Sequence, residues 1–262
     1  MTDRIENRFQ TVREQGDKAL ITYIMAGDPD IQKTGSYVEA FIKGGADIVE
    51  LGMPFSDPIA DGPVIQKAAQ RALQSGTNIK MILGLVSTVR QTSDVPVVLM
   101  GYVNPVIKYG IEKFFKDAAA SGVDGVIIPD LPLEEIGIIQ DYADQSGIDA
   151  VLLAAPTSDK KRLLQLAKNT KGFLYYISLT GVTGSAKGID IKVFDSIKWI
   201  KGQTEKPVAA GFGISTPEQA RMIAGVADGI VVGSAFVKLV ETHKDASNDL
   251  LALAHSLKSA IK

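Results

Sequence analysis

Cysteine is absent from this sequence of 262 residues, which excludes disulfides, thiolate zinc sites and a cysteine nucleophile. Histidine is scarce as well. The only two copies, His243 and His255, fall in the last stretch of helical pattern, where we expect them at the surface or in packing. The sequence therefore argues against a Ser-His-Asp triad and against a histidine-rich metal site. Acid–base chemistry is left to Asp, Glu, Lys or Tyr.

Long apolar stretches and basic clusters are missing too. The formal net charge is −2 and no run of Lys or Arg forms a basic stripe, which argues against a nucleic-acid partner. No apolar run is long enough to span a bilayer, so we expect no membrane partner. The N-terminal residues MTDRIENRF are charged and do not resemble a signal peptide. These absences predict a cytoplasmic protein.

Eight short runs rich in apolar and β-branched residues recur along the chain. Most of them are continuous rather than alternating, which is typical of parallel strands that are covered on both faces. The runs span Ala19–Gly27, Ala46–Phe55, Val95–Tyr102, Gly125–Leu131, Asp149–Pro156, Phe173–Leu179, Pro207–Ile214 and Gly229–Phe236.

Amphipathic segments separate these runs, and several of them stop at glycine, as helices commonly do. They span Ile31–Lys43, Glu112–Ser121, Leu133–Ser146, Ser158–Lys168, Ile191–Lys201 and Thr216–Ala224, with two helices between Pro63 and Arg90 that break near Gly76. This alternation predicts an α/β fold, a (β/α)8 TIM barrel, and a doubly wound open sheet is the alternative. Asp3–Gln15 and Ser247–Ile261 are predicted extra terminal helices. Without a linker, residues 1–262 are expected to form one domain.

Glycines gather at the ends of the last three predicted strands, in Gly181–Gly184, Gly211–Gly213 and Gly233-Ser234. Glycine lets backbone N–H groups approach an anion closely, and TIM barrels often bind phosphate with the last strand loops. Ser234 also stands where a helix begins, a position that attracts phosphate. These glycines either bind phosphate, which we favour, or only form tight turns. The GxGxxG and P-loop patterns are absent, so we infer neither a dinucleotide nor ATP.

Glu50 interrupts a strand pattern, Ile48–Gly52, that has no expected solvent face. A buried, unpaired carboxylate is costly, and it commonly remains protonated because its pKa rises. The residue is either catalytic, which we favour, or a structural carboxylate that pairs with Lys or Arg. The sequence shows no obvious partner for it.

Asp61 lies on the next loop, Pro54–Pro63, and we expect it to reach over the barrel mouth toward Glu50. Two carboxylates in different environments can divide acid and base roles. Three other aspartates at strand ends have either a turn-shaping or a functional role: Asp28, Asp57 and Asp130. Residues in or just beyond the strands suit a flat apolar ligand with a phosphate tail: Tyr23, Met100, Ile128, Tyr175, Phe212 and Val231.

The stretch VELGMPFSDPIADGPVIQKA resembles the signature of the tryptophan synthase α subunit family. Further matching stretches are YIMAGDP, MGYVNPV, IIPDLP, SLTGVTG, GFGIS and VVGSAFVK, and they follow in family order along nearly the whole chain. The resemblance implies a lyase of tryptophan biosynthesis. Its reaction is the retro-aldol cleavage of indole-3-glycerol phosphate to indole and glyceraldehyde 3-phosphate.

The resemblance also implies roles for individual residues. Glu50 matches the family's acid–base glutamate, and Asp61 matches the aspartate that binds the indole nitrogen. Thr183 matches a lid threonine in the expected lid Gly181–Ile189. The remaining implied substrate-binding residues are Tyr23 and Tyr175 near the ring, Phe212, and the phosphate-binding positions Gly184, Gly213, Gly233 and Ser234. Tyr23 falls where some members have Phe.

The implied partner is a tryptophan synthase β subunit in an α2β2 heterotetramer, which carries pyridoxal phosphate. No cofactor or metal is implied for this chain. Two alternatives stay open: a stand-alone indole-3-glycerol phosphate lyase, and a non-catalytic barrel that binds a phosphate ligand to regulate a partner. Rapid turnover by the isolated chain distinguishes the first alternative, and absence of indole release distinguishes the second.

Overall fold

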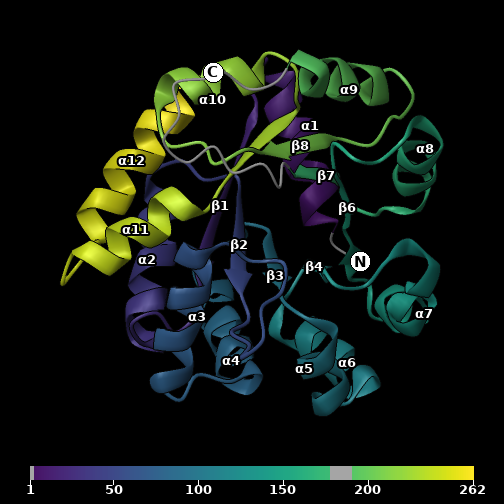
Figure 1. The fold of residues 1–262 in the computed structure, drawn as a ribbon. Coiled ribbons are helices and arrows are strands. Elements are labelled where there is room, and N and C mark those ends of the chain that lie inside the picture. Colours follow the sequence, from purple (N-terminus) through teal and green to yellow (C-terminus); the bar gives the residue numbers. More distant parts are fainter. Residues whose placement is uncertain (1–2, 178–190) are drawn as a thin grey trace.

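The computed structural model describes residues 3–177 and 191–262, and in this part parallel strands at the centre are surrounded by helices (Figure 1). Most residues of these strands are buried, which explains their continuous apolar sequences. The strands are β1 (Ala19–Met25), β2 (Ile48–Gly52), β3 (Val97–Met100), β4 (Gly125–Ile127), β5 (Asp149–Ala150), β6 (Leu152–Ala154), β7 (Leu174–Ile177), β8 (Val208–Gly211) and β9 (Gly229–Val232).

The predicted fifth strand, Asp149–Pro156, is divided at Val151 into β5 and β6. β5 pairs with β4, and β6 pairs with β7, so one continuous run of chain joins the two ends of the sheet order. The N–H of Val151 itself donates to the carbonyl of Val126 at 3.0 Å. The sheet therefore closes into the predicted (β/α)8 barrel, and the open-sheet alternative is wrong.

The helices largely follow the predicted segments. They are α1 (Arg4–Glu14), α2 (Ile31–Lys43), α3 (Pro63–Gln74), α4 (Ile79–Arg90), α5 (Val103–Tyr109), α6 (Ile111–Ser121), α7 (Gly137–Ser146), α8 (Lys160–Asn169), α9 (Ile191–Lys201), α10 (Pro217–Ala224), α11 (Ser234–Thr242) and α12 (Ser247–Ala260). Thr216 caps α10 in a reciprocal capping box with Gln219. The predicted helix Leu133–Ser146 is divided into a short 3-10 helix, η1 (Leu133–Glu135), and α7.

Asn104 and Pro105 belong to the first turn of α5. Pro105 is tolerated there because the N–H groups of a first helical turn have no acceptor within the helix. Asp130 supplies one instead: its carboxylate accepts the N–H of Val103 at 2.9 Å. A side chain distant in sequence therefore stabilises the start of this helix.

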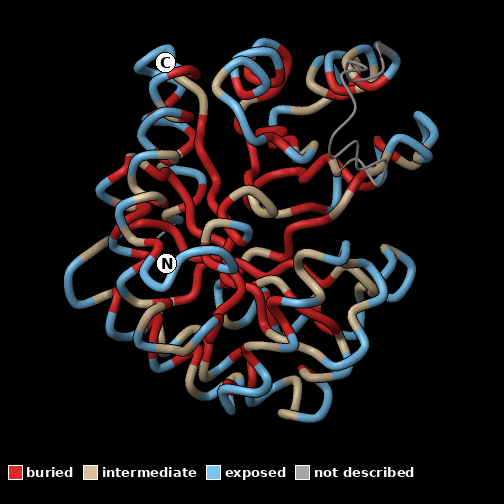
Figure 2. Tube along the Cα trace, turned by 60° about the vertical axis from the view of Figure 1, so that its left-hand side comes forward, coloured by how far each residue is buried: buried red, intermediate tan, exposed pale blue. Residues whose placement is uncertain are grey.

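Helix α1 closes the N-terminal end of the barrel. Its residues Ile5, Phe9 and Val12 belong to the same apolar cluster as the side chains inside the barrel. The Phe9 ring lies 5.6 Å from that of Phe173, measured between centroids. Buried residues follow the strands and the inner sides of the helices (Figure 2). With this end filled, the C-terminal ends of the strands are left for a functional site.

Candidate active site

Glu50 lies on β2 with its side chain inside the barrel, on the same face as Ile48. The residue is 0% exposed, and neither carboxylate oxygen has a hydrogen-bond partner among the described residues. Burial raises the pKa of Glu50 to about 8. The structural alternative, a salt bridge to Lys or Arg, therefore finds no support in the described part of the chain. At neutral pH the side chain is mainly a protonated acid.

Asp61 follows β2 on the loop that precedes α3, and Tyr102 holds its carboxylate. The Tyr102 hydroxyl donates to Oδ2 of Asp61 at 3.0 Å and accepts the N–H of Ala60 at 3.0 Å. Burial raises the pKa of Asp61, and the hydrogen bond from Tyr102 opposes that rise. Asp61 thus has the stabilising contact that Glu50 lacks.

Tyr102 was missed as a site residue by the sequence analysis. Its position in the sequence could have indicated this role, because Tyr102 comes two residues after the end of β3, at the barrel mouth. Its ring packs against Phe55, with centroids 5.5 Å apart, so that the loop carrying Asp61 is held at two points.

Tyr23 on β1 and Tyr175 on β7 are two further interior residues, 6% and 9% exposed. Burial raises the pKa of both phenols well above their usual value, and nearby carboxylates add to the rise. Glu50 contributes at Tyr175, and Asp61 followed by Glu50 contributes at Tyr23. Both hydroxyls therefore remain protonated and available as donors, close to the two predicted carboxylates.

The predicted phosphate positions lie at the ends of β8 and β9. Gly213 has a φ of 63°, in the left-handed region that glycine adopts readily. Gly233 precedes α11, whose first residue is Ser234, and no side chain caps this helix. The first turn of α11 also contains no acidic residue. Its free N–H groups and the helix dipole form a favourable environment for an anion.

Several predicted positions are not assembled in this way. Thr183 and Gly184, together with the predicted lid Gly181–Ile189, lie outside the described residues.

Asp28 has a structural role, because it is 1% exposed and accepts hydrogen bonds from both Nε and Nη2 of Arg71, at 2.8 and 2.7 Å. Asp57 is exposed on its loop. Phe212 is half-buried, and its ring stacks on Tyr176 with centroids 6.1 Å apart.

Neither histidine is part of this site: His243 follows α11, His255 lies on α12, and both are exposed. Among residues 3–177 and 191–262, no group of three or more His, Asp or Glu side chains is placed to hold a metal ion. No helix in the same residues is long and apolar enough to cross a membrane.

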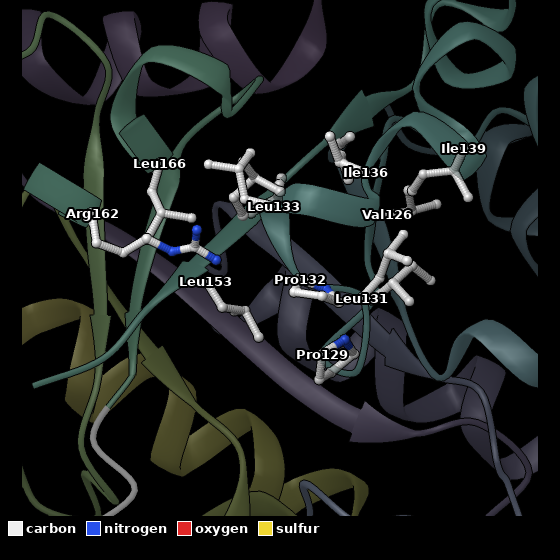
Figure 3. A pocket seen from close by; sticks show the side chains of 14 residues that line it. Val126, Pro129, Leu131, Pro132, Leu133, Ile136, Ile139, Leu153, Arg162 and Leu166 are labelled. Carbon is white, nitrogen blue, oxygen red and sulfur yellow. The ribbon is translucent and has the colours of Figure 1, made fainter. Parts of the chain in front are cut away.

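A cavity of about 110 Å³ lies beside the barrel, between β4, β6, η1 and α8. Its lining is mostly aliphatic, and Leu133, Leu153 and Ile136 are among its side chains (Figure 3). The one charged group, Arg162, pairs with Glu134 at 2.9 Å between Nη2 and Oε2. This cavity therefore offers no acid–base group for catalysis.

A larger groove of about 660 Å³ is formed by the loop after β2 together with α4 and α5. It is lined by Phe55, Asp57, Asn104 and Pro105, among other residues. Ile59, on the same loop, is 83% exposed. The loop that carries Asp61 therefore also contributes to an outer, partly apolar surface.

The tryptophan synthase alpha chain family model matches residues 9–262. The chain belongs to this family. It is 46% identical over 260 residues to the tryptophan synthase alpha chain of Geobacter sulfurreducens, covering 98% of each. The counterpart from Caldanaerobacter subterraneus subsp. tengcongensis is 50% identical over 238 residues, covering 91% of this chain and 90% of the relative.

Solved structures of family members agree with this fold. The tryptophan synthase alpha chain of Legionella pneumophila superimposes with a TM-score of 0.90 at 36% identity, covering 100% of this chain and 98% of that one. A chain of M. tuberculosis tryptophan synthase in its aminoacrylate-bound form gives 0.89 at 31% identity, with 99% of each chain covered.

Proposed function

We propose that this chain is the α subunit of a tryptophan synthase and cleaves indole-3-glycerol phosphate to indole and glyceraldehyde 3-phosphate. Membership of the alpha chain family supports the reaction. The observation that carries the mechanism is Glu50, a fully buried carboxyl group without a partner inside the barrel. We further propose that residues 1–262 form a single domain.

Glu50 exchanges protons with the substrate in two steps. Its protonated carboxyl group first donates to C3 of the indole ring, which leaves the ring nitrogen positively charged. The resulting carboxylate then takes the proton from the glycerol hydroxyl next to the ring. As this hydroxyl becomes the aldehyde carbonyl, the carbon–carbon bond breaks and its electron pair restores the aromatic ring. One proton is given and one is taken, so Glu50 ends as it began.

Asp61 stabilises the charge that develops on the ring nitrogen. A carboxylate is suited to this role because it attracts the N–H most strongly when that nitrogen is positive, in the intermediate. The hydrogen bond from Tyr102 favours the ionised form of Asp61. Two carboxyl groups in different surroundings thus have different roles: Glu50 transfers protons, and Asp61 stabilises the positive charge on the ring nitrogen.

The phosphate group binds at Gly213, Gly233 and Ser234, where the N-terminus of α11 is uncapped. By family resemblance, Gly184 completes the phosphate site, and Thr183 is the lid threonine that pairs with Asp61. Tyr23, Tyr175 and Phe212 bind the remaining, mostly apolar part of the substrate. Phosphate binding at one end and a carboxylate at the other fix the scissile bond beside Glu50.

The partner is a tryptophan synthase β subunit, which carries pyridoxal phosphate and joins indole to serine in an α2β2 complex. The groove between the Pro54–Pro63 loop and α5, with exposed Ile59 nearby, supports a partner surface next to the substrate pocket. Direct transfer is advantageous because indole is apolar and otherwise diffuses away. A cytoplasmic location is part of this proposal, since indole-3-glycerol phosphate and indole are both intermediates of biosynthesis.

The test measures indole release from indole-3-glycerol phosphate by the purified chain, with and without a β subunit. A low rate that rises when β is added is the expected result. A full rate from the isolated chain indicates a stand-alone lyase instead. No release under either condition indicates a regulatory barrel and contradicts the proposed reaction.

A further inference from the structure

Tyr23 extends from the phosphate side of the site to the neighbourhood of Glu50. A methyl group placed on Gly233 would lie 3.2 Å from Cδ1 of Tyr23, so the base of the ring rests on the residue before α11. A methyl group placed on Gly52 would lie 2.3 Å from the Tyr23 hydroxyl oxygen. The hydroxyl therefore occupies the space that the absent side chain of Gly52 leaves open.

The position of Gly52 places this hydroxyl beside Glu50. Gly52 follows Glu50 by two residues on β2, so both face the barrel interior. Tyr23 and Glu50 are also direct neighbours in the pairing of β1 with β2. Asp61 and Glu50 both raise the pKa of Tyr23, which places its phenol in the electrostatic field of both carboxyl groups.

The Tyr23 hydroxyl is an available donor. Burial and the two carboxyl groups keep it protonated at all ordinary pH values. No hydrogen bond joins it to another residue within the described ranges. A buried polar group without a partner provides specificity when a ligand atom completes its hydrogen bond.

We propose that the Tyr23 hydroxyl hydrogen-bonds the hydroxyl-bearing chain of the substrate, between its phosphate and its ring, and so selects for hydroxylated ligands. The inference rests on the proposed function, which places phosphate at Gly233 and the scissile bond at Glu50. Because Tyr23 extends from one of these points to the other, its hydroxyl lies beside the middle of the bound substrate. This contact aligns the hydroxyl that Glu50 must deprotonate.

The test compares two phosphate esters that differ only in their hydroxyl groups, glycerol 3-phosphate and n-propyl phosphate. Calorimetry measures the affinity of each for the wild-type chain, for Tyr23→Phe and for Tyr37→Phe. Tyr37→Phe is the matched control, since it removes a hydroxyl from a buried tyrosine on α2, outside the site. Thermal midpoints confirm that all three proteins are folded.

We expect Tyr23→Phe to reduce the preference for glycerol 3-phosphate by about tenfold, the usual effect of one hydrogen bond. Its affinity for n-propyl phosphate should equal that of the wild type, and Tyr37→Phe should retain the full preference. In turnover, Tyr23→Phe should lower kcat/KM for indole-3-glycerol phosphate by a similar factor.

An unchanged preference in folded Tyr23→Phe overturns the inference while leaving the proposed function intact. An equal loss of affinity for both esters also overturns it, because the ring rather than the hydroxyl would then be responsible. A wild-type chain that binds neither ester contradicts the phosphate site of the proposed function, and the inference fails with it.

Discussion

Asp124, at the N-terminal end of the barrel, and Glu50, toward its C-terminal end, are both buried carboxyl groups, 7% and 0% exposed. Asp124 accepts hydrogen bonds from Arg4 at 2.9 Å, from Arg90 at 2.5 Å and from the N–H of Val97 at 2.8 Å. Glu50 accepts none from the described residues.

The arrangement at Asp124 recurs at the N-terminal end. Asp47 and Asp228 also directly precede strands, and each accepts an N–H from the neighbouring strand and pairs with a lysine. These contacts offset the cost of removing a carboxylate from water. At Glu50 the cost is not offset, and the raised pKa is its consequence. The difference indicates that one end of the barrel serves stability and the other serves chemistry.

The largest effect is expected from Glu50→Gln, which keeps the shape of the side chain but removes its acid–base function. Turnover of indole-3-glycerol phosphate should fall by at least ~10²-fold, as for loss of a general acid–base group. Glu112→Gln is the control, because Glu112 is exposed on α6, where it pairs with Lys116. Near-normal turnover by folded Glu50→Gln would refute the assignment.

The same variant should not lose stability. Because the folded-state pKa of Glu50 is raised from 4.5 to about 8, ionisation is unfavourable in the fold. The contribution of Glu50 to the free energy of unfolding of the wild type is therefore fully present below pH 4.5, and it is lost as the pH rises toward 8. The thermal midpoint of Glu50→Gln relative to wild type should rise between pH 5 and pH 8. A constant difference across this range would contradict the raised pKa.

Asp124→Ala should show the opposite pattern. It leaves Nη2 of Arg90 and the N–H of Val97 without this acceptor. Loss of one partner of a buried pair costs about 3–5 kcal/mol in the free energy of unfolding. Urea denaturation measures this loss, while turnover per folded molecule should stay near that of wild type. Asp94→Ala is the control, since Asp94 is 92% exposed and should contribute less than about 1 kcal/mol. A loss of activity larger than the loss of folded protein would argue against a purely structural role.

Gly213→Asp tests the phosphate side of the mouth. A carboxylate there should raise KM by about tenfold, because like charges near a protein surface repel by more than about 1 kcal/mol. Gly213→Asn is the matched control, since it adds a similar side chain without charge in the same backbone conformation. The added side chain meets no atom within 4 Å of its Cβ in the described part of the protein. Equal KM values for the two variants would indicate a steric effect rather than a charge effect.

The smallest effect is expected from Tyr102→Phe. The hydrogen bond from Tyr102 lowers the pKa of Asp61, so its removal should raise that pKa further. If Asp61 acts in its ionised form, the acidic limb of the kcat/KM profile should move to higher pH. An unmoved acidic limb would mean that Asp61 does not control it.

The sequence alone predicted the succession of strands and helices because each element is encoded by its own residues. Ile31–Lys43 is found unchanged as α2, and the predicted segment Thr216–Ala224 contains all of α10. Local patterns also drew attention to Glu50, since a charged residue inside a buried strand is conspicuous without any structure. Division of the fifth strand at Val151 was not predictable, because it results from a change of pairing partner at closure of the barrel.

Only the tertiary structure decided which of the candidate aspartates have partners. Asp28 meets Arg71 across 43 residues of chain, and Asp61 meets Tyr102 across 41. Asp130 stabilises the start of α5 from 27 residues away. Such contacts depend on how closure of the barrel brings separate strand ends together, and no local pattern of residues encodes that distance. The sequence therefore predicted which residue types lie at the barrel mouth, whereas the fold determined whether each carboxyl group is ionised.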